Sequence, residues 1–249
     1  QHDVVIISPT GGTGRTAEVG AITWAKRFTH LIGSAAPIHS TPRAGMSWTG
    51  TETTCFTVSE NGCIFKNVVF NANSATTVGC VMVTGDYNYF EGCHFLGMNN
   101  ATTATAAGAY CLSLTGAEEN LFVSCTLGGI TVARDDANWN LELRSNASMN
   151  RFIDCDFNVQ GTHSSVTWLD ASTNTAIQGF CDFIGCRFLN YTLTAMTVGL
   201  TTAASGGYVR MLNSHWYGAT NLASFNAAVL TNGVAATASD AGVLLVQAN

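Results

Sequence analysis

The stretch Phe90-Glu91-Gly92-Cys93-His94-Phe95 decides the fold of this chain, because close variants of it occur six times. Each copy begins with an aromatic or large apolar residue, has a small residue or a thiol fourth, and ends with another large apolar residue. The other copies occupy residues 65–70, 122–127, 152–157, 183–188 and 211–216. Successive copies start 25, 32, 30, 31 and 28 positions apart, which is the spacing of a repeat architecture.

The phrase predicts a strand, a corner and a second strand. Cys93 and Phe95 are two apart and share a face of a strand, whereas Phe90 is three before Cys93 and breaks that alternation. A turn between them would let all three side chains point inward. The third positions suit such a turn, because Gly, Asn and Asp tolerate a left-handed backbone. These positions are Asn67, Gly92, Ser124, Asp154, Gly185 and Asn213.

Another strand signal precedes most copies of the phrase, at residues 80–83, 111–114, 140–143 and 166–169. These segments are too short for helices, and turn residues follow them. Each coil therefore holds about three short strands and three bends, and stacked coils form a parallel β-helix. An antiparallel sandwich or barrel also uses many short strands. Neither of these antiparallel folds requires one corner motif to recur in register.

Stacking predicts interior columns of like residues. The first runs from Phe65 to Met211, and a second consists of thiols. The thiols are Cys93, Cys125, Cys155 and Cys186. A third column contains Asn88, Asn120 and Asn150, whose amides would bond one coil to the next. The chain has nine cysteines, and the four of the thiol column are predicted to be reduced core thiols, because parallel side chains fit disulfide geometry poorly. A structural zinc site would need CxxC-type spacing, and the sequence contains none.

Charge and hydropathy limit the partners. Charged residues make up 10% of the chain, against about 25% in ordinary soluble proteins. The net charge is −6 and no basic patch occurs, so nucleic acid is not an expected partner. No apolar run reaches the ~20 residues of a membrane span. The polar surface must consist of Thr, Ser, Asn and Gln, which favours a long-lived extracellular particle or a large assembly.

The repeat also predicts the organisation of the chain. Residues 1–218 are expected to form the solenoid body, including an N-terminal entry coil. Residues 16–24 are predicted to be a short capping helix. Residues 219–249 lack the phrase and are predicted to form a C-terminal cap or an oligomerisation tail, because the open end of a solenoid needs cover.

One outward column carries candidate chemistry. It follows the thiol column and contains His94, Thr126, Asp156, Arg187 and His215. An acid, a base and a cation on one face would suit glycoside hydrolysis or lyase chemistry. The alternative is an exposed ladder of opposite charges, which contributes little. Asp154 occupies a corner position, and Asp182 precedes the next phrase. We favour the ladder, and the sequence predicts no catalytic residue, no cofactor and no metal site.

Three tryptophans are also candidates for stacking on sugars. They are Trp48, Trp139 and Trp168. Packing in the core or at a subunit interface is the expected use of each.

Two segments carry a family resemblance. Residues 28–33 and 56–70 resemble the pectate-lyase-like right-handed β-helix superfamily. The opening Asp3-Val4-Val5-Ile6-Ile7-Ser8-Pro9 and the order of segments resemble the short β-helix proteins of tailed-phage virions, which serve as capsid decoration (cement) proteins or tail parts. The resemblance implies an all-β, right-handed parallel β-helix of about seven coils. No catalytic motif of the lyases or hydrolases can be carried over to a position here.

We therefore expect a non-enzymatic phage virion protein. The expected role is a capsid decoration protein that stabilises the shell, working as a homotrimer on the major capsid protein or another virion protein. The expected location is the capsid surface rather than the tail. The alternative is a tailspike-like or secreted β-helix that binds or cleaves polysaccharide, and a third possibility is a bacterial adhesin.

Overall fold

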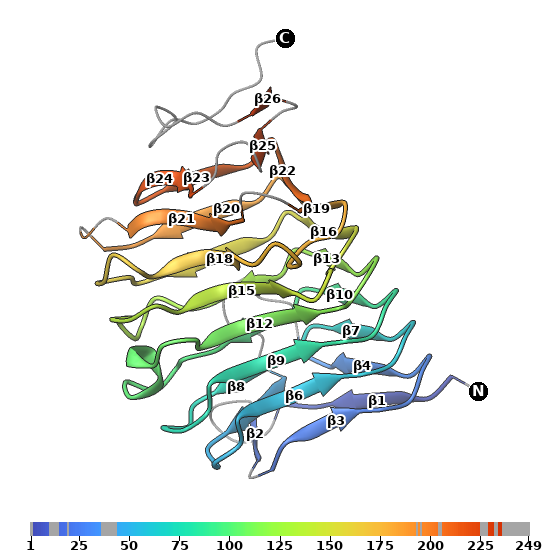
Figure 1. The fold of residues 1–249 in the computed structure, drawn as a ribbon. Coiled ribbons are helices and arrows are strands. Elements are labelled where there is room, and N and C mark those ends of the chain that lie inside the picture. Colours follow the sequence, from blue (N-terminus) through green and yellow to red (C-terminus); the bar gives the residue numbers. More distant parts are fainter. Residues whose placement is uncertain are drawn as a thin grey trace.

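The computed structural model describes residues 2–9, 15–18, 20–35, 44–192, 194, 196–203, 206–224, 229–231 and 234–235. Strands and bends wind this part of the chain into a solenoid of about seven turns, with the first strands at one end and the last at the other (Figure 1). Within these residues the helical structure is one 3-10 turn, Thr103–Thr105, and no helix is long and apolar enough to cross a membrane.

Three sheets form the sides of the solenoid, and one strand of each belongs to every complete coil. Sheet A contains, in spatial order, β1 (Val4–Ile7), β4 (His30–Gly33), β7 (Ile64–Lys66), β10 (Tyr89–Glu91), β13 (Leu121–Val123), β16 (Asn150–Ile153), β19 (Phe180–Ile184), β22 (Tyr208–Leu212), β25 (Val229–Thr231) and β26 (Val234–Ala235). Sheet B contains β2 (Arg15–Glu18), β5 (Gly45–Trp48), β8 (Val69–Ala72), β11 (His94–Leu96), β14 (Thr126–Leu127), β17 (Asp156–Val159), β20 (Arg187–Asn190) and β23 (His215–Tyr217). Sheet C contains β3 (Ile22–Trp24), β6 (Thr54–Val58), β9 (Gly79–Val83), β12 (Tyr110–Thr115), β15 (Trp139–Arg144), β18 (Thr167–Ala171), β21 (Met196–Thr202) and β24 (Ala219–Ala223).

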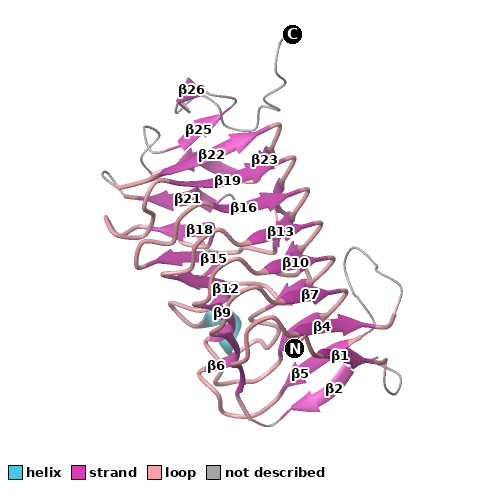
Figure 2. Ribbon diagram, turned by 90° about the vertical axis from the view of Figure 1, so that its right-hand side faces the viewer, coloured by secondary structure: helices cyan, strands magenta, loops and turns pink. Residues whose placement is uncertain are grey.

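Neighbouring strands of these sheets pair in parallel, and the antiparallel pair β25–β26 is the exception among the described strands. Figure 2 shows the strands of sheet A stacked one above the other. The predicted fold class, an all-β right-handed parallel β-helix of about seven coils, is confirmed.

The aromatic column lies where the repeat predicts it. Phe65, Phe90, Phe122, Phe152 and Phe183 are register partners on successive strands of sheet A. Their rings are nearly parallel, with centroids 4.5 to 5.1 Å apart. All five are fully buried. The first position of the phrase therefore builds a continuous stack along the axis.

The predicted corner is confirmed at all six third positions. Each of them has a positive φ, between 49° and 66°. This left-handed residue lies between a strand of sheet A and the following strand of sheet B, and it changes the direction of the chain there. Phe90 and Cys93 consequently both point inward, although they are three residues apart.

All nine cysteines are buried and free, and they fall on three interior columns. The thiol column of the phrase is confirmed, and each of its thiols donates to the backbone carbonyl of an aromatic residue, as Cys125 does to Phe90 at 3.6 Å. Cys55, Cys80 and Cys111 form a second column in sheet C, which the sequence reasoning missed. Burial raises the pKa of the Cys125 thiol, so this thiol stays protonated.

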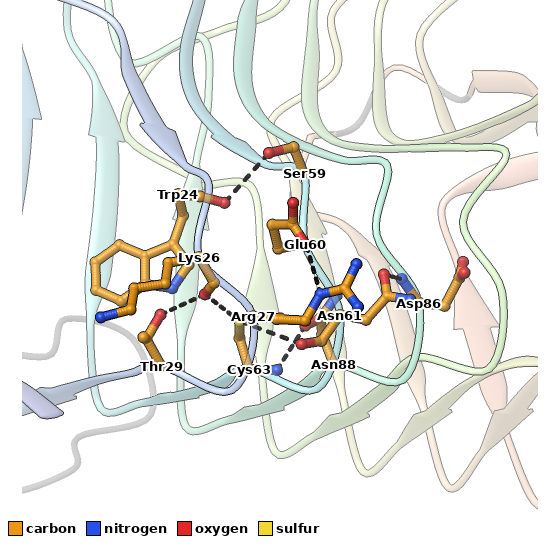
Figure 3. A network of polar contacts seen from close by, with 10 residues as sticks. All are labelled: Trp24, Lys26, Arg27, Thr29, Ser59, Glu60, Asn61, Cys63, Asp86 and Asn88. Atoms are coloured by element: carbon orange, nitrogen blue, oxygen red, sulfur yellow. Dashed lines mark hydrogen bonds and ion pairs between the residues drawn. The ribbon is translucent and has the colours of Figure 1, made fainter. Parts of the chain in front are cut away.

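The asparagine column links the coils as predicted. The side-chain oxygen of Asn88 accepts from the backbone N–H of Cys63 at 2.8 Å, and that of Asn120 accepts from Asn88 at 2.8 Å. Asn150 accepts in turn from Asn120 at 3.0 Å. Figure 3 shows the first of these bonds at the turn that enters sheet A. The column carries hydrogen bonds between bends that the sheet ladders do not reach.

The predicted helix at residues 16–24 is wrong. The chain forms β2 and β3 there, which pair with β5 and β6. Pairing with the sheet edges overrides the local pattern, because it satisfies backbone groups along both sheets. In the segment 219–249, β24 continues sheet C and β25 continues sheet A, whereas residues 225–228, 232–233 and 236–249 lie outside the described part.

Candidate functional site

The outward column of sheet B has the predicted register. His94 pairs with Thr126, Asp156 with Arg187, and Arg187 with His215. It is not a fully exposed ladder, because His94, Thr126 and Asp156 are buried. The side chain of Arg187 remains 44% exposed. Something therefore covers the N-terminal part of this face.

The cover is the connection between β14 and β15, residues 128–138, which forms one side of a cavity of about 520 Å³. The cavity lies over four consecutive strands of sheet B, β11, β14, β17 and β20, so it spans successive coils along the solenoid axis. Its lining residues are His94, Leu96, Thr126, Gly128, Gly129, Ile130, Thr131, Asp156, Asn158, Arg187, Leu189 and Tyr191.

A paired carboxylate and guanidinium lie in the floor of the cavity. Arg187 Nε and Nη2 bind the two carboxylate oxygens of Asp156, with Nη2–Oδ2 at 2.6 Å. The hydrogen bonds that Arg187 donates to Asp156 raise the pKa of Arg187. The pair is bidentate, so the planar guanidinium is held in one orientation toward the cavity.

His94 ties the floor to the wall. Its Nε2 lies 2.8 Å from the carbonyl oxygen of Gly128, so Nε2 carries the proton and donates. Gly128 itself has φ +84°, and a Cβ at this position would lie 2.3 Å from the carbonyl oxygen of Asn158. Glycine is therefore required where the wall leaves sheet B.

A buried arginine anchors the same wall. Arg134 Nη1 donates to Asn140 Oδ1 at 2.5 Å and Nη2 to Cys111 Sγ at 3.2 Å. Its backbone N–H donates to the carbonyl of Gln160 at 2.8 Å, and its carbonyl accepts from Thr162 Oγ1 at 3.0 Å. This role of Arg134 could not be predicted, because the residue stands in a loop, where a charge is ordinarily solvated.

Exposed apolar groups line the outer part of the cavity. Tyr191 follows β20 and is 54% exposed, while Ile130 projects from the wall and Leu189 is half-buried on the floor. The aromatic residue at the site is thus a tyrosine. Trp48 and Trp168 are fully buried, which confirms their core role, and Trp139 is half-buried on sheet C.

The other predicted carboxylates do not join Asp156. Asp154 occupies its corner and is exposed. Asp182 lies on sheet A, bonded to Arg210 at 2.6 Å and 3.5 Å from Arg151. The cavity therefore contains one carboxylate rather than a facing pair.

Sheet C carries two further acids that the sequence reasoning missed. Glu142 and Asp170 are register partners on the outer face of β15 and β18. Ser113 Oγ donates to Glu142 at 2.7 Å, and Arg144 Nη2 lies 2.6 Å from it. Burial raises the pKa of Asp170. Within the described ranges, no cluster of three or more His, Cys, Asp or Glu side chains has a geometry that could hold a metal ion.

Comparison with known proteins is informative at the level of structure. No protein-family model matches the sequence, and no curated protein matches it. Pectin methylesterase PemA from Erwinia chrysanthemi matches with a TM-score of 0.51 and 14% identity, over 94% of this chain and 82% of its own length. The tailspike protein gp49 of Acinetobacter baumannii bacteriophage Fri1, a capsular polysaccharide depolymerase, matches with a TM-score of 0.51 and 14% identity over 92% of this chain.

ORF18 of Geobacillus virus E2 matches over 93% of this chain with a TM-score of 0.42 and 13% identity. The chain spans about half the length of both phage proteins, 53% of ORF18 and 51% of the tailspike. The likeness shows the fold. It confirms the resemblance to the pectate-lyase-like right-handed β-helix as a statement about architecture.

These matches correct one prediction. The chain was expected not to be an enzyme, on the ground that no catalytic motif could be recognised. The same coil architecture carries a methylesterase and a depolymerase, so the missing motif gives no reason to exclude catalysis.

Proposed function

We propose that this chain is a tailspike-like β-helix that binds a polysaccharide in the cavity over sheet B. The observation that carries the proposal is that one cavity, which spans four coils, combines the bidentate Asp156–Arg187 pair with exposed apolar walls. The two charged residues are register partners on the paired strands β17 and β20.

The chemistry of sugars fits this lining. Hydroxyl groups need fixed donors and acceptors, which the carboxylate, the guanidinium and the amide of Asn158 provide. The C–H faces of a pyranose ring need apolar contact, which Tyr191 and Ile130 offer at the outer rim. A cavity that follows four strands suits a chain of sugar units better than a compact metabolite.

The structural neighbours support the same class of partner. Two proteins of this fold with TM-scores of 0.51 carry names that refer to pectin and to capsular polysaccharide. The tailspike match favours a place in a phage tail over the capsid surface. Capsid decoration, attachment to a major capsid protein and a homotrimeric state remain predictions that need their own evidence.

The test is binding of the purified chain to an array of bacterial capsular polysaccharides and O-antigens, together with measurement of released reducing ends. We expect Arg187→Ala to weaken binding about tenfold or more, because it removes charge-assisted hydrogen bonds. Arg210→Ala is the matched control, since Arg210 makes the same bidentate pair with Asp182 on sheet A.

Binding that Arg187→Ala and Arg210→Ala weaken equally would place the site elsewhere. Absence of binding to every polysaccharide of the array would refute the function. Released reducing ends that disappear in Asp156→Asn would add cleavage to the proposed activity.

A further inference from the structure

The floor of the cavity continues beyond its last lining strand. Arg187 and Leu189, the outward residues of β20, are register partners of His215 and Tyr217 on β23. Both outward columns that form the floor therefore extend by one more coil toward the C-terminal end. The coil separation is one strand spacing, about 4.8 Å, which is close to the length of one sugar unit in an extended chain.

The floor ends abruptly in the other direction. At the N-terminal side the same columns are occupied by Val69 and Asn71 on β8, the register partners of His94 and Leu96. Both are buried, and Asn71 is bonded to Ser47 at 2.7 Å. A chain lying in the cavity can therefore extend over exposed sheet only toward the C-terminal end.

Tyr217 is well suited to meet such a chain. Its side chain is 63% exposed, and it is the last residue of β23, the terminal strand of sheet B. The preceding Trp216 is buried, which fixes the strand so that Tyr217 points outward. The phenol ring is thus an exposed platform with an apolar face and a polar tip.

We infer that Tyr217, with His215 beside it, forms an additional subsite that binds one sugar unit outside the cavity. The inference rests on the proposed function of the cavity and deepens it. The polysaccharide lies along the solenoid axis, crosses the Asp156–Arg187 pair, and places its next ring on the phenol of Tyr217. Affinity then depends on chain length, because only an oligosaccharide that overruns the cavity reaches this ring.

The experiment measures affinity against chain length. The probes are fluorescently labelled oligosaccharides of graded length, made by partial acid hydrolysis of the capsular polysaccharide or O-antigen that binds most tightly in the array. The variants are Tyr217→Ala and, as a matched control, Tyr208→Ala, which removes a 51% exposed tyrosine from sheet A. We expect the unaltered chain to gain about tenfold in affinity at the length that first reaches Tyr217.

Tyr217→Ala should lose this gain while it binds the shorter oligosaccharides as before, and Tyr208→Ala should keep it. A gain that persists in Tyr217→Ala, or a loss that is equal at all lengths, overturns the subsite and leaves the cavity function standing. If none of the polysaccharides binds the unaltered chain, the function of the cavity itself is refuted and the subsite with it.

Discussion

Two aspartate–arginine pairs of nearly identical construction lie on different faces of this solenoid. Asp156 and Arg187 are on adjacent strands of sheet B, and Asp182 and Arg210 are on adjacent strands of sheet A. Both pairs are bidentate, and both have a buried carboxylate and a partly exposed guanidinium. The sheet B pair lines a cavity of about 520 Å³, whereas Arg210 packs on the ring of Phe180, 3.9 Å from its centroid.

The difference lies in the connections. From β7 onward, the link from sheet A to sheet B is a corner of two residues, one of them left-handed, which is too short to form a wall. The link from sheet B to sheet C varies, and after β14 it is long enough to form a wall. The stacked strands place both ion pairs in register, and the loop after β14 encloses a cavity beside one of them.

Distortion of the wall at Gly128 should have the largest effect on stability. Gly128→Ala combines a left-handed backbone with a contact of 2.3 Å to the carbonyl of Asn158, and it should lower the free energy of unfolding by about 3 kcal/mol. Gly116→Ala is the control, because Gly116 is also left-handed but its nearest contact would be an ordinary 3.5 Å. It should cost about 1 kcal/mol. Urea denaturation of both variants measures the difference, and equal losses would mean that the wall is not tightly fitted.

Substitution of Arg134, which anchors the wall, should have the second-largest effect on stability. Arg134→Met keeps the length of the side chain but leaves Asn140 Oδ1 without its donor, and it should cost about 2 kcal/mol. Arg144→Met, which alters an exposed arginine on sheet C, should cost less than about 1 kcal/mol. Thermal midpoints provide the comparison. Protease cleavage within residues 128–138 should also accelerate in Arg134→Met, and unchanged cleavage would show that Arg134 does not hold the wall.

The two carboxylates should separate stability from binding. Asp182→Asn should cost about 2 kcal/mol, because Asp182 compensates both Arg151 and Arg210, and Asp156→Asn should cost about 1 kcal/mol. Polysaccharide binding should show the reverse order, with a loss in Asp156→Asn alone. The comparison between the faces would be broken if both variants bound equally well.

The smallest effect concerns the arginines themselves. Arg187→Ala and Arg210→Ala should each lower the free energy of unfolding by less than about 1 kcal/mol, because both guanidiniums are more than a third exposed to solvent. Denaturation curves of the two variants should therefore nearly coincide. A much larger loss for Arg187→Ala would mean that its pair with Asp156 serves the fold rather than the cavity.

The fold could be predicted in detail because the pattern that determines it lies within a few neighbouring residues. The parity break between Phe90 and Cys93 indicates a corner, and recurrence of the same break six times indicates stacking in register. The register of His94, Thr126, Asp156, Arg187 and His215 followed from the repeat alone.

The cavity could not be predicted in the same way. It depends on where residues 128–138 fold back, and that path is set by Arg134 binding Asn140 and Cys111 from neighbouring strands. None of these three residues belongs to the repeated phrase. The helix expected at residues 16–24 failed for a related reason, since pairing with β5 and β6 outweighs local preference.

The buried thiols determine how this protein reacts with alkylating reagents and oxygen once it unfolds. Each of the nine is shielded while the coils are stacked, and all nine become available together once the chain unfolds. An alkylating reagent should therefore report loss of structure as an abrupt increase in labelling. In air the released thiols would cross-link at random, so refolding has to outpace oxidation, and recovery after heating should require a reducing agent.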